Sequence, residues 1–311
     1  MVGAISENGA RMAQGRKHRI TEKRILAMQT WRPRRIQLST EWPLSIEAAT
    51  WTGGAARLVL PFRETLEPAF RLMCGPRTAR FRKDPVHPWV LELKGRGSGA
   101  GRQAQVRAWL DTVGQYVAIR DWLDLSFALS YDRAQGREKG ARTRIGDLRI
   151  RAKPLDDLAT PQVFAAADLL TAACLEFLER MTCYHRAEAV AAAPSARGAR
   201  NYHLAGHLAR GIARARGLKN LSASIRTVRD RPATKGRALG AKLGNLTGSV
   251  TLDAEAFQGR KVILVDDIYQ SGTTLNYLGK LLYEAGAAAV YGLVCEKTSR
   301  DDDNILPAEG K

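Results

Sequence analysis

Val262-Ile-Leu-Val-Asp-Asp-Ile-Tyr-Gln-Ser-Gly-Thr-Thr274 is the stretch that decides the fold of the second half of the chain. Its first four residues are apolar, and a run of this length is typical of a buried parallel strand. Two carboxylates, Asp266 and Asp267, follow at once, and a turn that contains hydroxyl groups and a glycine comes after them. The leucine spacing beyond Thr274 predicts a helix. The stretch therefore predicts a strand, an acidic strand end, a turn and a helix, in that order.

The turn has the composition of a phosphate-binding site. Its residues are Gln270, Ser271, Gly272, Thr273 and Thr274. A glycine lets the backbone approach a ligand closely, and the N-terminus of the following helix adds a partial positive charge. The two carboxylates beside the turn can accept hydrogen bonds from two neighbouring sugar hydroxyls. The site therefore suits a ligand that carries a phosphate group close to two neighbouring hydroxyls, as ribose 5-phosphate does.

Length, composition and charge limit the class of protein. The chain has 311 residues, of which 45% are hydrophobic, enough for two domains with real cores. Its net charge is +18, and the excess of basic residues is larger in residues 1–142 than in the rest. Such a charge favours anionic partners, nucleic acid above all, although an arginine-rich proteome would explain it equally well.

The sequence predicts a cytoplasmic protein that does not cross a membrane. We find no apolar run of the length that spans a bilayer and no apolar core of a signal peptide. The cysteines form neither CxxC pairs nor a disulfide framework, which indicates reduced thiols. The four cysteines are Cys74, Cys174, Cys183 and Cys295.

Three regions follow from the patterning of the chain. Residues 1–30 are polar and basic, and we expect a flexible tail that is disordered or loosely helical. Residues 31–142 predict an accessory domain of mixed, β-rich structure, with a linker over 132–143. Residues 143–311 alternate strands and helices, which predicts an α/β domain with a parallel sheet covered by helices on both faces. The main expected strands are 35–38, 56–60, 89–93, 123–129, 188–193, 220–228, 262–265 and 290–295, and the main expected helices are 103–116, 161–184 and 202–216.

The stretch at 262–274 resembles the signature of type I phosphoribosyltransferases, which bind phosphoribosyl pyrophosphate (PRPP). Residues 143–298 resemble, more narrowly, the competence-associated ComF-like subfamily. That resemblance rests on Ile145-Gly-Asp-Leu148, Ala193-Pro-Ser195, Leu204-Ala, Leu208-Ala, Arg226 with Arg229, and Asn245-Leu-Thr-Gly248. The chain departs from the subfamily in lacking a four-cysteine zinc module, so no zinc is predicted. It also carries Lys235 and Lys242 where the flexible loop usually has Gln and Arg.

The resemblance implies a role for each of these residues. Asp266 and Asp267 would be the catalytic pair that holds the ribose hydroxyls, and residues 270–274 would bind the 5-phosphate. The family's pyrophosphate loop falls on Ser195, Arg197 and Gly198, and its flexible loop falls on Arg226, Arg229 and Lys235. Mg²⁺ would be bound through PRPP near the two aspartates, without a direct side-chain ligand. Gln270 stands where purine-salvage relatives carry an acid, which argues against purine salvage.

Two functions follow, and they belong to different classes. The first is an enzyme that transfers phosphoribose from PRPP to an unidentified nitrogen acceptor. The second is a non-catalytic, nucleic-acid-associated protein that senses PRPP and contacts DNA through its basic N-terminal half. A weaker alternative is a metal-dependent nuclease in residues 31–130, with Glu92 and Lys94 at a strand end and Asp84 upstream.

Overall fold

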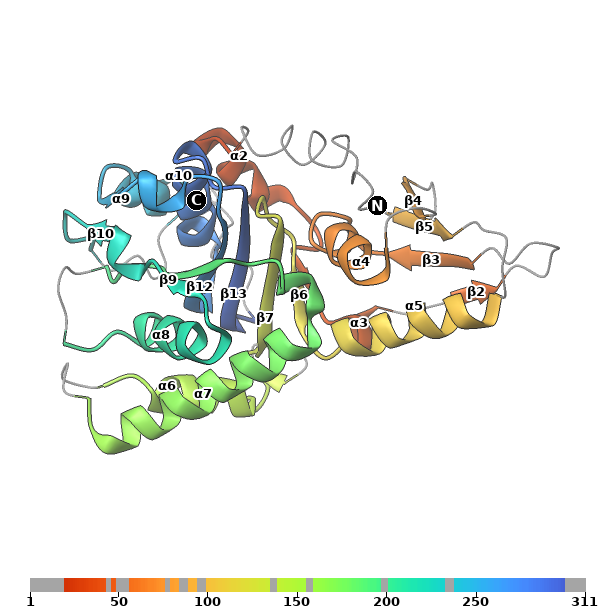
Figure 1. Ribbon diagram of the computed structural model, residues 1–311, viewed down its shortest axis with the longest axis horizontal. Helices are drawn as coiled ribbons and strands as arrows, with labels where there is room; N and C mark the ends of the chain where they lie inside the picture. The colour runs from red at the N-terminus through yellow and green to blue at the C-terminus, as the bar shows by residue number, and fades with distance from the viewer. Residues whose placement is uncertain are drawn as a thin grey trace, which may run out of the picture.

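A seven-stranded sheet forms the centre of the protein, in the computed structural model that gives its structure (Figure 1). The described residues are 20–42, 46–48, 56–75, 79–83, 89–93, 99–134, 139–154, 159–196, 201–232 and 238–299. The strand order is β1-β6-β7-β13-β12-β8-β9. These strands are β1 (Arg35–Ile36), β6 (Val117–Ile119), β7 (Leu125–Tyr131), β8 (Ala189–Ala192), β9 (Lys219–Asn220), β12 (Lys261–Tyr269) and β13 (Ala289–Lys297). The five strands from β7 to β9 run parallel, and β6 and β1 add an antiparallel edge.

Helices cover both faces of the sheet, as the sequence predicts for an α/β domain. Strand β12 alternates: Val262 and Leu264 pack on one face and Ile263 and Val265 on the other. The first pair contacts the core beneath α2 (Glu22–Ala27), α9 (Leu239–Leu246) and α10 (Thr273–Glu284). The second pair contacts the core beneath α6 (Arg144–Arg151), α7 (Pro161–Arg180) and α8 (Leu204–Arg216). The predicted fold class is therefore confirmed.

A second, four-stranded antiparallel sheet carries the rest of the N-terminal half, in the order β2-β3-β5-β4. Figure 1 shows it beside the central sheet, accompanied by helices α4 and α5. Its elements are β2 (Ile46–Ala48), β3 (Ala56–Leu60), α4 (Leu66–Cys74), β4 (Ala79–Arg82), β5 (Trp89–Leu93) and α5 (Gly99–Val113), and α3 (Leu38–Glu41) lies between β1 and β2 in the chain.

The boundary predicted at residue 142 runs through the central sheet. Strands β1, β6 and β7 belong to the segment assigned to the accessory domain, yet β7 pairs with β13 along its length. One hydrophobic core also extends from the central sheet into the second sheet, and the rings of Tyr116 and Phe177 meet at 4.7 Å within it. Pairing between strands that are distant in sequence depends on tertiary folding, and the sequence pattern of a strand does not identify the strand with which it pairs. Residues 31–142 therefore contribute to both sheets.

The last third of the tail predicted over residues 1–30 is helical but packed on the core rather than flexible. Helix α2 and the 3₁₀ turn η1 (Met28–Thr30) form there, and Thr21 caps α2 by accepting a hydrogen bond from the Arg24 N–H. Ile25 and Met28 are fully buried in the core that α9 and α10 share. Ile20 is buried in the same core, so these three apolar side chains anchor the short segment on the sheet. Residues 1–19 lie outside the described part.

One expected strand is divided in the structure. The strand expected over 220–228 is split among β9, the 3₁₀ turn η4 (Ser222–Ser224) and β10 (Ile225–Thr227), and β10 pairs with β11 (Val250–Leu252). Further 3₁₀ turns are η3 (Thr182–Tyr184) and η5 (Glu255–Phe257).

Helix α7 is long and apolar enough to cross a membrane by length and composition, contrary to the sequence-based expectation. The same composition suits a core helix. Its residues Val163, Leu170, Cys174 and Phe177 are buried against the central sheet and α8. Among the described residues it is the one helix that meets this criterion.

The shared sheet predicts that residues 143–311 do not fold alone. This fragment lacks β7 and exposes the edge of β13, with its buried residues Tyr291, Leu293 and Cys295. We expect the fragment to show no cooperative thermal transition by circular dichroism, whereas a fragment of residues 20–311 melts like the full chain. A cooperative melt of the 143–311 fragment would contradict this result.

Candidate active site

The turn after β12 is held in a conformation that only glycine tolerates well. Gly272 has a φ of 79° and caps the N-terminus of α10. A Cβ atom on Gly272 would collide with the hydroxyl of Tyr269, so a larger residue is excluded by contact as well as by φ. The hydroxyls of Ser271 and Thr273 lie 2.8 Å apart. The turn therefore presents backbone N–H groups and hydroxyls at the positive end of a helix.

One pocket of about 420 Å³ brings most of the predicted site residues together. Such a volume lies within the range of small-molecule sites, roughly 300–1,000 Å³. The predicted residues that line it are Ser195, Asp266, Asp267, Gln270, Ser271, Gly272, Thr273 and Thr274. The aspartates, the glycine turn and the loop after β8 thus face one cavity, and the turn is open to it.

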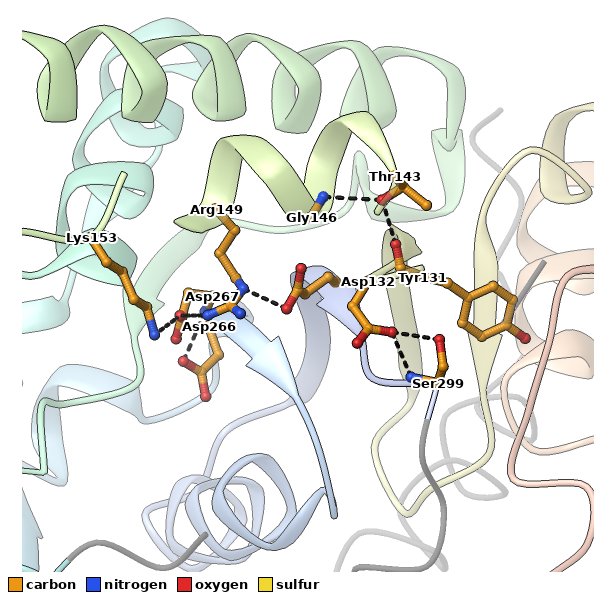
Figure 2. Close-up of polar contacts among 10 residues, drawn as sticks. Tyr131, Asp132, Thr143, Gly146, Arg149, Lys153, Asp266, Asp267 and Ser299 are labelled. Atoms are coloured by element: carbon orange, nitrogen blue, oxygen red, sulfur yellow. Dashed lines mark hydrogen bonds and ion pairs between the residues drawn. The ribbon is translucent and has the colours of Figure 1, made fainter. Parts of the chain in front are cut away.

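The two aspartates differ in their electrostatic surroundings, as Figure 2 shows. The Asp267 carboxylate lies 2.5 Å from the Lys153 ammonium and 3.4 Å from the Arg149 guanidinium. Burial alone would raise the pKa of Asp267, but these two cations outweigh it and its pKa lies below the usual value. For Asp266, burial and then the charge of Asp267 raise the pKa well above the usual value. Asp267 is therefore the carboxylate that keeps its charge.

Helix α6 supplies Arg149, and the segment just beyond its C-terminus supplies Lys153, the two cations that hold Asp267. Thr143 caps this helix by accepting a hydrogen bond from the Gly146 N–H, and its hydroxyl donates to the Tyr131 carbonyl at the end of β7 (Figure 2). Arg149 also lies 2.5 Å from the buried carboxylate of Glu296, whose pKa burial raises to about 7. The sequence analysis missed Arg149 and Lys153. Their spacing of four residues, at one end of a basic helix, is the signal that could have suggested them.

Arg231 holds the loop after β8 through hydrogen bonds to its carbonyls. The Arg231 guanidinium donates to the carbonyls of Pro194 and Ser195 at 3.0 Å each, and the Arg231 N–H donates to the Ala196 carbonyl. Arg231 lines the pocket, and so does Lys242, whose side chain is almost fully buried on α9. Together with Lys153, they make a cationic wall around the two aspartates.

Arg226 and Arg229, which the resemblance assigns to the flexible loop, are described in the structure but do not line this pocket. Arg226 donates to the Ala223 carbonyl and Arg229 to the Thr247 carbonyl, and both side chains are exposed. Arg197, Gly198 and Lys235 lie outside the described residues, as do Asp84 and Lys94. Glu92 forms an ion pair with Arg82 at 2.9 Å, which fits a charged strand surface.

A buried carboxylate supports the turn from beneath. Asp121 accepts hydrogen bonds from the Ser126 hydroxyl at 2.7 Å, the Leu123 N–H at 3.0 Å and the Tyr269 hydroxyl at 3.1 Å. Asn276 donates to the same Tyr269 hydroxyl at 3.2 Å. Burial raises the pKa of Asp121 to about 6, and these hydrogen bonds lower it only in part. The network fixes the tyrosine whose hydroxyl lies under Gly272.

The acidic side chains of the pocket suit a metal ion that takes most of its ligand atoms from a bound substrate and from water. Where the structure is described, no three His, Cys, Asp or Glu residues are grouped as they would be around a metal ion. Asp266 and Asp267 are the carboxylates that line the pocket, and Asp267 is already paired with Lys153. Mg²⁺ prefers several oxygen ligands and often takes them from substrate phosphates and water. The residues present therefore fit Mg²⁺ carried by a phosphorylated ligand.

The fold and the pocket define the class of protein, an α/β protein with the type I phosphoribosyltransferase fold. Residues 197–303 match the family described as "Phosphoribosyl transferase domain".

No curated protein matches the chain. Among solved structures, the chain is similar to glutamine phosphoribosylpyrophosphate (PRPP) amidotransferase from B. subtilis, complexed with ADP and GMP, with 14% identity and a TM-score of 0.28. The match covers 78% of this chain and 46% of that chain, so this protein spans less than half the length of that enzyme.

The raised pKa of Asp121 predicts a pH-dependent stability. Its folded pKa exceeds its unfolded pKa, so the native state holds an extra proton between about pH 4 and pH 6, and the free energy of unfolding falls as pH rises through this window. Asp121→Asn removes this dependence. We expect the stability of the variant relative to wild type to rise by on the order of 3 kcal/mol from pH 4 to pH 7, measured by urea unfolding.

The exposed Asp253→Asn is the matched control for this measurement, and it should follow the wild-type pH dependence. Parallel curves for Asp121→Asn and wild type would show that Asp121 does not titrate in this range.

Proposed function

We propose that the protein binds PRPP together with Mg²⁺ and transfers phosphoribose to a nitrogen acceptor. The observation that carries this proposal is the pocket itself, in which a glycine turn at a helix N-terminus, two aspartates and the Ser195 loop face one another. The turn suits the 5-phosphate, the aspartates suit the ribose hydroxyls, and the loop with its cationic wall suits the pyrophosphate.

The chain's own residues support a dissociative displacement at C1 of the ribose. The bond from C1 to the pyrophosphate oxygen breaks and its electron pair leaves with pyrophosphate, while the acceptor nitrogen forms the new bond to C1 and loses its proton to water. Asp267, which stays ionised, accepts a hydrogen bond from a ribose hydroxyl and stabilises positive charge on the ring. Arg231 and Lys242 favour the departing anion. Bound Mg²⁺ would neutralise pyrophosphate further.

Lys153 must release Asp267 when a ribose binds. The two groups form an ion pair at 2.5 Å, and the Lys153 side chain is about half exposed at the pocket wall. A ribose hydroxyl would take the place of the ammonium on Asp267, and Lys153 would then be available to a phosphate oxygen. Arg149, which is held by Glu296 as well, would keep Asp267 charged during this exchange.

Several finer assignments belong to the same proposal. Arg197, Gly198, Arg226, Arg229 and Lys235 are proposed to act in the pyrophosphate and flexible loops when the ligand is bound. We also propose membership of the ComF-like subfamily and a cytoplasmic location. The location is supported by the four free cysteines, of which Cys174, Cys183 and Cys295 are buried.

A second candidate is a protein that binds PRPP without turnover and associates with nucleic acid. The net charge of +18 favours it, because a positive field attracts polyanions. Salt-sensitive DNA binding, together with PRPP binding that releases no pyrophosphate in the presence of any acceptor, would decide for this candidate.

The function is tested by titration calorimetry with PRPP and Mg²⁺ and by pyrophosphate release with a panel of nitrogenous bases and amines. We expect wild type to bind PRPP, and Asp267→Asn to bind it roughly tenfold to a hundredfold more weakly, since a charged hydrogen bond is worth about 1.5–3 kcal/mol. Asp253→Asn, an exposed change of the same kind, should bind like wild type. Absence of PRPP binding by the folded wild-type protein would refute the proposal.

A further inference from the structure

Arg34 is a buried arginine whose role the central sheet does not explain. It lies just before β1, it is 2% exposed, and its Nη2 donates to the Ser271 carbonyl at 2.8 Å, 237 residues away in sequence. Its Nε and Nη1 are buried and find no hydrogen-bond partner in the described part of the chain. The buried carboxylate of Asp121 interacts favourably with this charge, but two buried donors without partners still cost stability and call for a further explanation.

Asn276 binds the next peptide of the same turn from the same protein interior. Its side-chain N–H donates to the Gly272 carbonyl at 2.8 Å, and its side-chain oxygen accepts from the Trp122 N–H at 3.0 Å. Asn276 is fully buried in the first turn of α10. The carbonyls of Ser271 and Gly272 are thus both held by interior side chains.

These two contacts, together with the helical hydrogen bond that the Asn276 backbone N–H donates to the Gly272 carbonyl at 3.0 Å, determine where the N–H groups of the turn point. In a trans peptide the carbonyl and the following N–H point in opposite directions. Because the Ser271 and Gly272 carbonyls point to Arg34 and Asn276, the N–H groups of Gly272 and Thr273 point the other way, toward the pocket that both residues line. The Gly272 N–H has no partner among the described residues, and the Thr273 N–H has only a long contact of 3.4 Å with the Ser271 hydroxyl.

We infer that Arg34 and Asn276 are positioning residues that set the Ser271–Gly272 and Gly272–Thr273 peptides to bind the phosphate monoester of the ligand. Arg34 also places a positive charge behind the turn, where it strengthens the attraction for a dianion. The inference rests on the proposed function, since it takes PRPP as the ligand. Arg34 lies far outside the matched residues 197–303, so a segment from the N-terminal half completes the phosphate site.

The Arg34→Met variant tests the inference through three probes: PRPP with Mg²⁺, ribose 5-phosphate, and inorganic pyrophosphate. Titration calorimetry should show weaker binding of PRPP and ribose 5-phosphate by about tenfold to a hundredfold, the range for a charged hydrogen bond. Pyrophosphate, which has no sugar ester, should bind with an affinity within about twofold of wild type. A general loss of structure would weaken all three probes alike.

Arg35→Met is the matched control. Arg35 is the next residue, and its Nη2 donates to the Ser299 carbonyl rather than to the turn. It should leave the affinity for ribose 5-phosphate unchanged. If wild type binds PRPP and Arg34→Met binds PRPP and ribose 5-phosphate equally well, the inference is overturned while the proposed function stands. If wild type binds neither PRPP nor ribose 5-phosphate, the proposed function itself is refuted, and the inference that rests on it is refuted with it.

Hydrogen exchange on the wild-type protein tests the same geometry without a variant that has to fold. Saturating ribose 5-phosphate should slow exchange of the Gly272 and Thr273 amides, because these N–H groups become hydrogen-bond donors to the phosphate. Unchanged exchange of both amides at saturation would show that they do not face the ligand, and the inference would be wrong.

Discussion

Parallel pairing of β12 with its two neighbours is the constraint on which the site depends. Val265 pairs with Ala192 of β8, and Asp266 pairs with Val294 of β13, so the carboxyl ends of these strands meet at one edge of the sheet. The chain leaves β8 into the Ser195 loop at that edge and leaves β12 into the glycine turn. Segments that lie some 75 residues apart in sequence therefore face a common pocket.

The pocket combines two kinds of polar group with opposite demands. Backbone N–H groups and cations attract phosphate, whereas Asp266 and Asp267 repel it. Pairing with Lys153 and Arg149 keeps Asp267 charged. The neighbouring Asp266, which is buried and lies beside this charge, tends to keep its proton and so repels phosphate less. Split pKa values in neighbouring carboxyl groups are typical of sites that bind or transform a ligand.

Residues from several elements of the fold support the glycine turn. Tyr269 lies under Gly272 and is held by Asp121 and Asn276, and Arg34 reaches the Ser271 carbonyl from the N-terminal segment. Two of these supporting groups, Asp121 and Arg34, are far from 262–274 in sequence. They carry no motif, because a side chain that orients a peptide needs only to be in the right place after folding.

The sequence by itself determined the β12 strand, the turn and helix α10, because apolar run length, glycine and leucine spacing are local signals that survive without tertiary context. The resemblance to phosphoribosyltransferases implied further that Ser195, Asp266 and Asp267 belong to one site. Only the tertiary structure decided that β7 completes the sheet, that α6 and the residues just after it bring Arg149 and Lys153 to Asp267, and that Arg34 lies behind the turn. Strand pairing and charge pairing join residues distant in sequence, and neither the composition nor the periodicity of a segment identifies its partner.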